Sequence, residues 1–402
     1  MTPLFLSCLG ALVMAFCLGS VGFTIPLLLD DWKTSNFLLG IIPSTGALTF
    51  LSAAPFMGRL SDRVGQRPLI CVVLLVWGAS MASIPFLPRP EWLFLFLPIS
   101  GLAAAGYWPS LESYFFEASE GKNVVKGLRF YNMGWTLGLA VGPLIAGFLY
   151  SVSPKIVFFL VGGAVFALSF LFLKTPAPGK VKGLHHDEPH AHKRFSFSLL
   201  VSAWIGVFLA CLFMGCFRNL FPRLGRSELL LSEPTIGTLI SLYFFCLLVL
   251  FPLLGGRDFW VGKRWPLLAA LLFEGVGVAA VFLGSTPFFI GSGIALVAVG
   301  YAQAYSAGLF YAMTSSEEKR GFLCGCHEGI IGTGFFLGPA MGGAVSTVAN
   351  LRTPYAVIAS LVGLGFLLAA GHLRKDRLKQ RQASRPKPHK PHRPRSEQAP
   401  IR

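Results

Sequence analysis

Apolar residues occupy twelve long stretches of the chain, and short polar segments separate them. The stretches lie near 4–29, 36–57, 68–87, 92–116, 124–150, 155–173, 197–221, 234–255, 264–284, 287–313, 321–348 and 353–373. A helix needs about 20 apolar residues to cross the hydrocarbon core of a bilayer. In lipid only helices and closed barrels satisfy all backbone polar groups, and these stretches are too long for barrel strands. The pattern predicts an all-α polytopic membrane protein with twelve transmembrane helices.

The chain repeats itself across a polar segment at its middle. Gly142-Pro143 recurs as Gly338-Pro339, and Pro26 recurs as Pro222. Parallel halves related by an axis along the membrane normal, with a binding site between them, are typical of secondary transporters. We therefore expect two pseudo-symmetric six-helix bundles at 1–174 and 197–373, a His-rich linker at 175–196, and a disordered basic tail at 374–402.

Composition agrees with insertion into a membrane. Of the residues, 54% are hydrophobic and 13% are charged, whereas soluble domains carry about 25% charged residues. The net charge of +16 would favour a nucleic-acid partner in a soluble chain, but here it comes from loops and the tail. The eight cysteines all fall within apolar stretches, where they are interpreted as small buried hydrophobes and not as a disulfide framework.

The lysines and arginines set the orientation. If the polar turn at 58–68 lies inside, most of the 34 basic residues are cytoplasmic, as the positive-inside rule requires. Both termini are then cytoplasmic, in a multi-pass protein of the cell (inner) membrane. The basic tail can touch anionic lipid or dock a partner, and the four linker histidines either bind a transition metal or belong to a solvated linker.

The turn at 58–68 reads Gly-Arg-Leu-Ser-Asp-Arg-Val-Gly-Gln-Arg-Pro, and 255–264 carries a partial copy of it. It resembles the loop between the second and third helices of the major facilitator superfamily. The resemblance extends from the first helix to the twelfth. It implies a charge relay that latches the two halves when the outer side is open, formed by Gly58, Asp62, Arg63, Gly65, Arg67 and Glu117. The sequence departs from that pattern at Gln66, where a basic residue is usual.

The stretch 124–150 carries small residues four positions apart. They are Gly134, Gly138, Gly142, Pro143 and Gly147. Such a ridge lets helices approach closely. It also resembles the antiporter motif of the drug:proton efflux branch, which implies an exporter; plain helix packing is the alternative. Leu97 stands where that branch usually carries an arginine, so proton coupling would need another residue.

Ionisable residues within the spans are candidates for function. Glu328 lies eight residues beyond Arg320, about 12 Å into the membrane. Glu328 and His327 can both exchange protons, and we expect them to couple transport to protons or to recognise a cation. A metal site using Cys324 and Cys326 is disfavoured, because residues two apart point to nearly opposite helix faces.

Further polar and aromatic residues are expected to line a central cavity that suits an amphiphilic solute. They are Tyr107, Trp108, Glu112, Arg129, Tyr131, Asn132, Trp135, Tyr243, Tyr301, Gln303 and Tyr305. For Arg129 a structural ion pair with Glu112 or Glu117 is favoured over contact with the solute. The sequence does not show what Glu274 packs against. Arg218 is expected to extend its side chain toward the outer interface.

Together these features predict a monomeric secondary transporter that exports a small amphiphilic molecule against protons by alternating access. It is expected to need no cofactor or metal. The alternatives are an importer or uniporter, and a non-transporting sensor or assembly factor that docks through the tail. An enzyme is disfavoured because the sequence has no HExxH, GxSxG or phosphate-binding glycine loop.

Overall fold

The computed structural model describes residues 2–119, 124–175, 197–255, 259–314 and 317–383, with the backbone alone at 124–129, 255, 317–321 and 377–383. Its helices are α1 (Pro3–Asp31), α2 (Asn36–Val64), α3 (Gln66–Ser83), α4 (Leu93–Ala118), α5 (Val124–Val152), α6 (Pro154–Lys174), α7 (Phe197–Ser227), α8 (Glu233–Gly255), α9 (Trp265–Leu283), α10 (Pro287–Met313), α11 (Glu317–Val348) and α12 (Thr353–Ala383), with short 3-10 turns η1 (Ile84–Phe86) and η2 (Pro90–Trp92).

All twelve long helices contain a segment that is long and apolar enough to cross a membrane. No strand occurs among the described residues, so the all-α prediction is confirmed. Side-chain caps begin several helices; Thr2, Ser35 and Thr286 each accept a hydrogen bond from the backbone N–H three residues on. One boundary differs from expectation. Because α12 continues to Ala383, residues 374–383 are helical and not part of a disordered tail.

The two halves are built alike. Contacts between α1 and α5 in one half correspond to contacts between α7 and α11 in the other. Among the described residues, four have a positive φ: the non-glycine residues Lys33 and Leu230, and the glycines Gly65 and Gly262. Each pair is separated by the same interval along the chain, so the turns after α1 and α7, and those after α2 and α8, share their geometry.

The glycine ridge of α5 packs against α1. A Cβ at Gly138 would lie 2.3 Å from the Leu12 carbonyl oxygen, and one at Gly142 would lie 2.5 Å from that of Phe16. The equivalent ridge of α11 packs against α7, since a Cβ at Gly338 would lie 2.4 Å from the Leu212 oxygen. The ridges therefore hold together the helix pairs within each half.

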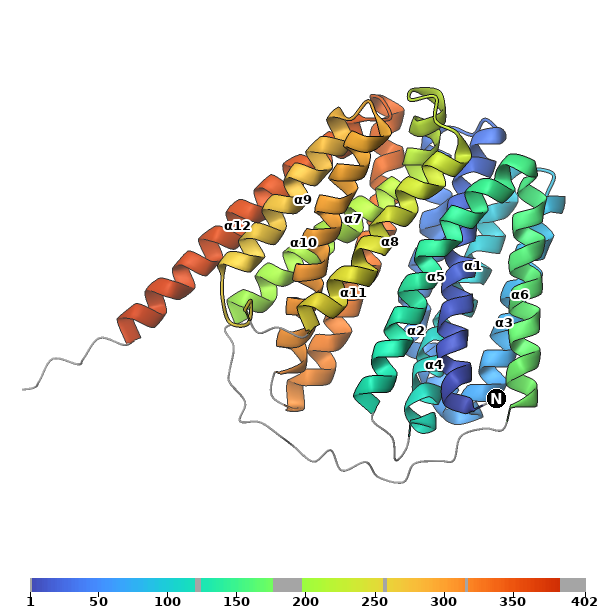
Figure 1. Ribbon diagram of the computed structural model, residues 1–402, viewed down its shortest axis with the longest axis horizontal. Coiled ribbons are helices and arrows are strands. Elements are labelled where there is room, and N and C mark those ends of the chain that lie inside the picture. The colour runs from blue at the N-terminus through green and yellow to red at the C-terminus, as the bar shows by residue number, and fades with distance from the viewer. Residues whose placement is uncertain (1, 120–123, 176–196, 256–258, 315–316, 384–402) are drawn as a thin grey trace, which may run out of the picture.

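The halves meet at one end of the molecule and diverge toward the other (Figure 1). We call the end with the α1–α2 and α7–α8 connections the closed end, and the end with the α2–α3 turn the open end. Near the closed end α2 packs on α11, where a Cβ at Gly40 would lie 2.1 Å from the Pro339 oxygen, and α5 packs on α8, where one at Gly237 would lie 2.5 Å from the Pro143 oxygen.

Contact between the halves stops partway along the helices. A Cβ at Gly332 of α11 would lie 2.9 Å from the Leu51 side chain of α2. Nearer the open end, no atom lies within 4 Å of the Cβ positions of Gly325 and Gly329. The halves are thus in contact near the closed end and apart toward the open end.

Candidate functional site

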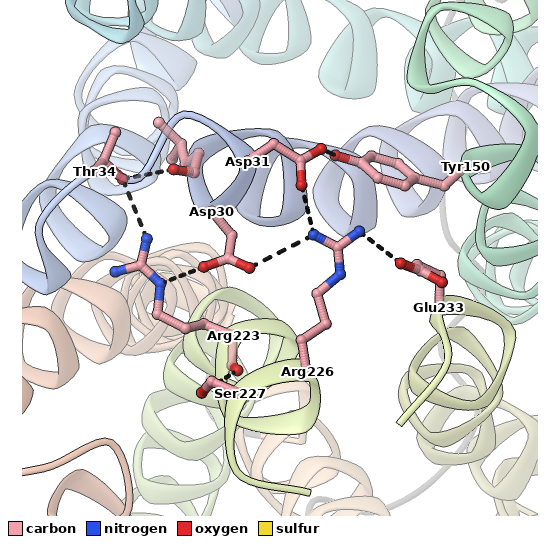
Figure 2. Close-up of polar contacts among 9 residues, drawn as sticks. Asp30, Asp31, Thr34, Tyr150, Arg223, Arg226, Ser227 and Glu233 are labelled. Atoms are coloured by element: carbon pink, nitrogen blue, oxygen red, sulfur yellow. Dashed lines mark hydrogen bonds and ion pairs between the residues drawn. The ribbon is translucent and has the colours of Figure 1, made fainter. Parts of the chain in front are cut away.

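Two acidic residues end α1, and two arginines lie near the end of α7. Arg223 Nε donates to Asp30 Oδ1 at 2.7 Å, and Arg226 Nη1 donates to Asp31 Oδ1 at 2.7 Å (Figure 2). A second oxygen of Asp30 lies 3.5 Å from Arg226. Both arginines belong to one half and both aspartates to the other, so these ion pairs join the halves at the closed end.

The network extends beyond those four side chains. Arg226 Nη2 also donates to Glu233 of α8 at 2.7 Å, and its guanidinium carbon lies 5.3 Å from the centre of the Tyr150 ring (Figure 2). The Tyr150 hydroxyl donates to Asp31 at 2.5 Å, and Arg223 Nη1 donates to Asn36 of α2 at 2.7 Å. The two arginines therefore connect α7 with α1, α2, α5 and α8. We call the residues that make these contacts the closed-end network: Asp30, Asp31, Asn36, Tyr150, Arg223, Arg226 and Glu233.

Neither the apolar pattern nor the sequence motifs pointed to the closed-end network. The repeat carries the signal that could have revealed the contact, because the interval that separates Gly142 from Gly338 also separates Asp30 from Arg226. Opposite charges at equivalent positions of two symmetric halves are brought together when those halves close on their axis.

A second group of polar side chains lies toward the open end. Glu112 of α4 and Glu328 of α11 are both exposed, and their carboxyl groups interact electrostatically across the space between the halves. Tyr305 of α10 interacts with both carboxyl groups. We call Glu112 and Glu328 the carboxylate pair. Together with Tyr305, the pair places ionisable groups of both halves around one space.

His327 and Glu328, predicted together as candidates for proton coupling, do not face the same surroundings. His327 is fully buried, and its ring lies 5.1 Å from that of Tyr305, with the Gly308 backbone next to it. Neither ring nitrogen has a hydrogen-bond partner among the described atoms. Successive helical residues point about 100° apart, so one of the two neighbours faces into its half while the other faces the space between halves.

The other predicted cavity residues divide into two groups. Asn132 is exposed and accepts a hydrogen bond from the half-buried Trp135 indole at 3.2 Å, and Trp108 is also half-buried. The side chain of Arg129 is outside the described part of the chain. The remaining five are buried inside their own halves: Tyr107, Tyr131, Tyr243, Tyr301 and Gln303.

The turn between α2 and α3 makes contacts within the N-terminal half. Gln66 donates to Glu117 at 2.8 Å and to Ser113 at 3.1 Å, so Glu117 is engaged by the residue that departs from the family pattern and by no arginine among the described side chains. Arg67 donates to the carbonyl groups of Phe172 and Leu173 at the end of α6. Asp62 and Arg63 are exposed, so the predicted relay is not formed between the halves in this conformation.

Glu274 lies deep in the C-terminal half. It is fully buried on α9, with Gly206 of α7 and Gly300 of α10 against its side chain. Neither carboxyl oxygen has a hydrogen-bond partner among the described atoms. Small residues on two neighbouring helices make the room for this side chain, away from the space between the halves.

Twelve membrane-crossing helices in two repeated halves, with a polar site between them, define a multi-pass membrane transporter of small solutes. The chain belongs to the Major Facilitator Superfamily, whose family model matches residues 7–222 and 203–400.

Two curated relatives are similar over most of the chain. Quinolone resistance protein NorA of Staphylococcus aureus (strain MSSA476) is 23% identical over 371 residues, which cover 87% of this chain and 92% of the relative. Multidrug resistance protein 1 of Bacillus subtilis (strain 168) is 23% identical over 382 residues, which cover 92% and 94%.

Solved structures agree on the fold. The nucleoside transporter NupG superposes with a TM-score of 0.77 at 13% identity and covers 92% of this chain and 100% of its own. A bacterial homologue of the human lysosomal transporter Spinster, in an inward-facing and occupied conformation, gives 0.74 at 16% identity and covers 94% and 99%. At such identities the likeness concerns the fold alone.

Proposed function

We propose that the protein exports a small amphiphilic organic molecule across the cell membrane in exchange for protons. The observation that carries this proposal is the carboxylate pair, Glu112 and Glu328, on opposite halves of an open space. The names of the NorA and Multidrug resistance protein 1 relatives support drug export. The basic residues of the α2–α3 turn favour a cytoplasmic position for the open end, and the conformation described is then inward-facing.

The carboxylate pair gives protons a physical means to act on the two conformations. When the open end closes, the halves approach and the two carboxyl groups come closer together. Two ionised carboxylates that share a site repel each other, so a proton on one of them favours closure. Protonation therefore stabilises the conformation open to the outside relative to the inward-facing one, so the equilibrium between the two conformations depends on the protonation of this pair.

The test is proton-driven uptake of norfloxacin, a quinolone, by inside-out proteoliposomes. We expect Glu328→Gln and Glu112→Gln to abolish the acceleration by a pH gradient while exchange of norfloxacin at equal pH persists. Glu91→Gln, which removes an exposed carboxylate on η2, is the matched control and should leave the acceleration intact. Normal pH-driven uptake by both glutamine variants would overturn the coupling role.

Transport of a nucleoside, as an importer or uniporter, is the second candidate, because the nucleoside transporter NupG has the same fold. The same proteoliposomes distinguish the two directions and solutes. Counterflow of uridine without any flux of norfloxacin would replace the export proposal. The same preparation also gives the direction of coupling. Norfloxacin uptake driven by an outwardly directed proton gradient indicates exchange, and uptake driven by an inwardly directed one indicates cotransport.

A further inference from the structure

Arg218 lies within the apolar span of α7, on the side that faces α1 of the other half. It precedes the end of α7 at Ser227 by nine residues, which is about 13 Å along the helix. Its Nη2 donates to the Leu18 carbonyl oxygen of α1 at 2.6 Å. The prediction that this side chain extends toward the outer interface is therefore wrong, because it crosses to α1 instead.

A missing side chain on α1 makes room for the guanidinium group. A Cβ at Gly22 would lie 1.3 Å from Arg218 Nη2 and 1.9 Å from its Cζ. The guanidinium thus occupies the volume that any other residue at position 22 would fill. Both Arg218 and Gly22 are half-buried, so the group lies at a boundary that solvent reaches and is not enclosed in either half.

No carboxylate neutralises Arg218 among the residues that the structure describes. On α1, Asp30 and Asp31 are held by Arg223 and Arg226, and on α8 Glu233 is held by Arg226. Glu274 of α9 lies against Gly206, twelve residues before Arg218 on α7, and on α11 the acid nearest in depth is Glu328, which lies toward the open end. Among the described residues none of these carboxylates forms an ion pair with Arg218.

An uncompensated cation at this depth is costly and marks a functional site. A guanidinium group carries five N–H donors in a planar fork, and one hydrogen bond to a neutral carbonyl uses a single donor. A purely structural link between α1 and α7 needs only a neutral donor. The remaining donors and the charge match the planar, bidentate geometry of a carboxylate.

We propose that Arg218 binds the anionic group, a carboxylate or a group of similar charge and shape, of the solute that the protein transports. This assignment rests on the proposed function, because it names the chemistry of the solute in the same space. The closed-end network lies between Arg218 and the closed end, so the anion would be held on the side of that network that faces the open end.

Binding at Arg218 also reaches the contact between the halves. An anion that takes up the guanidinium donors competes with the Leu18 carbonyl oxygen, which belongs to the opposite half. The solute therefore weakens one of the contacts that keep α1 and α7 together, and it does so only when it carries an anionic group. Selection of the solute and release of the closed conformation then depend on the same side chain.

The test is equilibrium binding to the purified full chain of three probes that share one ring system. They are 2-naphthoate, the neutral methyl 2-naphthoate and 2-naphthylmethylammonium, measured by displacement with the unfolding midpoint recorded for each variant. The variants are Arg218→Gln, Arg218→Lys, and Gly22→Ala, whose added methyl would displace the flexible end of the Arg218 side chain. Lys155→Gln, which removes an exposed cation at the start of α6, is the control.

We expect 2-naphthoate to bind wild type more tightly than either other probe, and Arg218→Gln to weaken that binding at least about 10-fold, as the loss of a charged hydrogen-bond partner requires. Gly22→Ala should weaken it as well, Arg218→Lys should retain part of it, and Lys155→Gln should match wild type. Absent or equal binding of the three probes, tighter binding of the ammonium, or unchanged naphthoate binding by folded Arg218→Gln would overturn the proposal. Binding without norfloxacin transport would overturn export and leave the anion site standing.

Discussion

Asp30 and Arg226 occupy equivalent positions of the two repeated halves, and their side chains face each other across the closed end with Oδ2 and Nη1 3.5 Å apart. Asp30 also holds Arg223 at 2.7 Å. One carboxylate thus restrains two cations of the opposite half, so its removal should loosen the closed end.

Asp30→Asn should shift the protein toward the conformation in which the closed end opens. Hydrogen bonds to charged groups contribute about 1.5–3 kcal/mol, and the arginines here are mostly shielded from solvent, so a shift of roughly 10-fold or more in the conformational equilibrium follows. Hydrogen–deuterium exchange of the α1–α2 connection measures it. Glu228→Gln is the control because its partner Arg352 is in the same half; exchange that rises equally in both variants would contradict the role of the network.

Gly40→Ala should push the closed end apart without unfolding the protein. The added methyl would lie 2.1 Å from the Pro339 oxygen and 2.8 Å from the Gly343 Cα of the other half, and backbone atoms cannot give way as a side chain can. Alanine itself favours the helix by about 1 kcal/mol. Limited proteolysis at the closed end should accelerate, whereas Gly163→Ala, with no atom within 4 Å, should behave as wild type.

Gly138→Ala should lower stability instead of changing conformation. The methyl would meet the Leu12 oxygen at 2.3 Å and the Phe16 nitrogen at 2.7 Å, and both belong to α1 of the same half. Overpacking of this kind costs about 1–3 kcal/mol. The thermal unfolding midpoint should fall while exchange at the closed end stays unchanged. A normal midpoint with altered transport would instead favour a directional role for the ridge.

Arg67 and Asp62 should respond differently, although they belong to one turn. Arg67→Ala removes the donors that cap the Phe172 and Leu173 carbonyls at the end of α6, so the unfolding midpoint should fall. Asp62 is exposed, so Asp62→Asn should leave the midpoint unchanged. If the latch forms when the outer side opens, norfloxacin transport by that variant should slow; wild-type transport would remove Asp62 from the mechanism.

The architecture followed from local properties of the sequence. A bilayer imposes a minimum apolar length on each helix, so twelve spans could be counted before any contact was known. The repeated Gly-Pro pairs predicted the symmetry of the halves, and glycines four apart predicted close helix packing, which Gly138 and Gly338 show.

The partners of the charged side chains needed the tertiary structure. Whether Glu328 or His327 faces the space between the halves, and whether Arg218 reaches outward or across to Leu18, depends on the rotation and tilt of each helix against its neighbours. Those are set by packing among residues distant in sequence. The sequence by itself determined the membrane spans and their pairing into halves, since the solvent dictates them residue by residue. Only the packed structure decided which charges meet, since that depends on how two halves are docked.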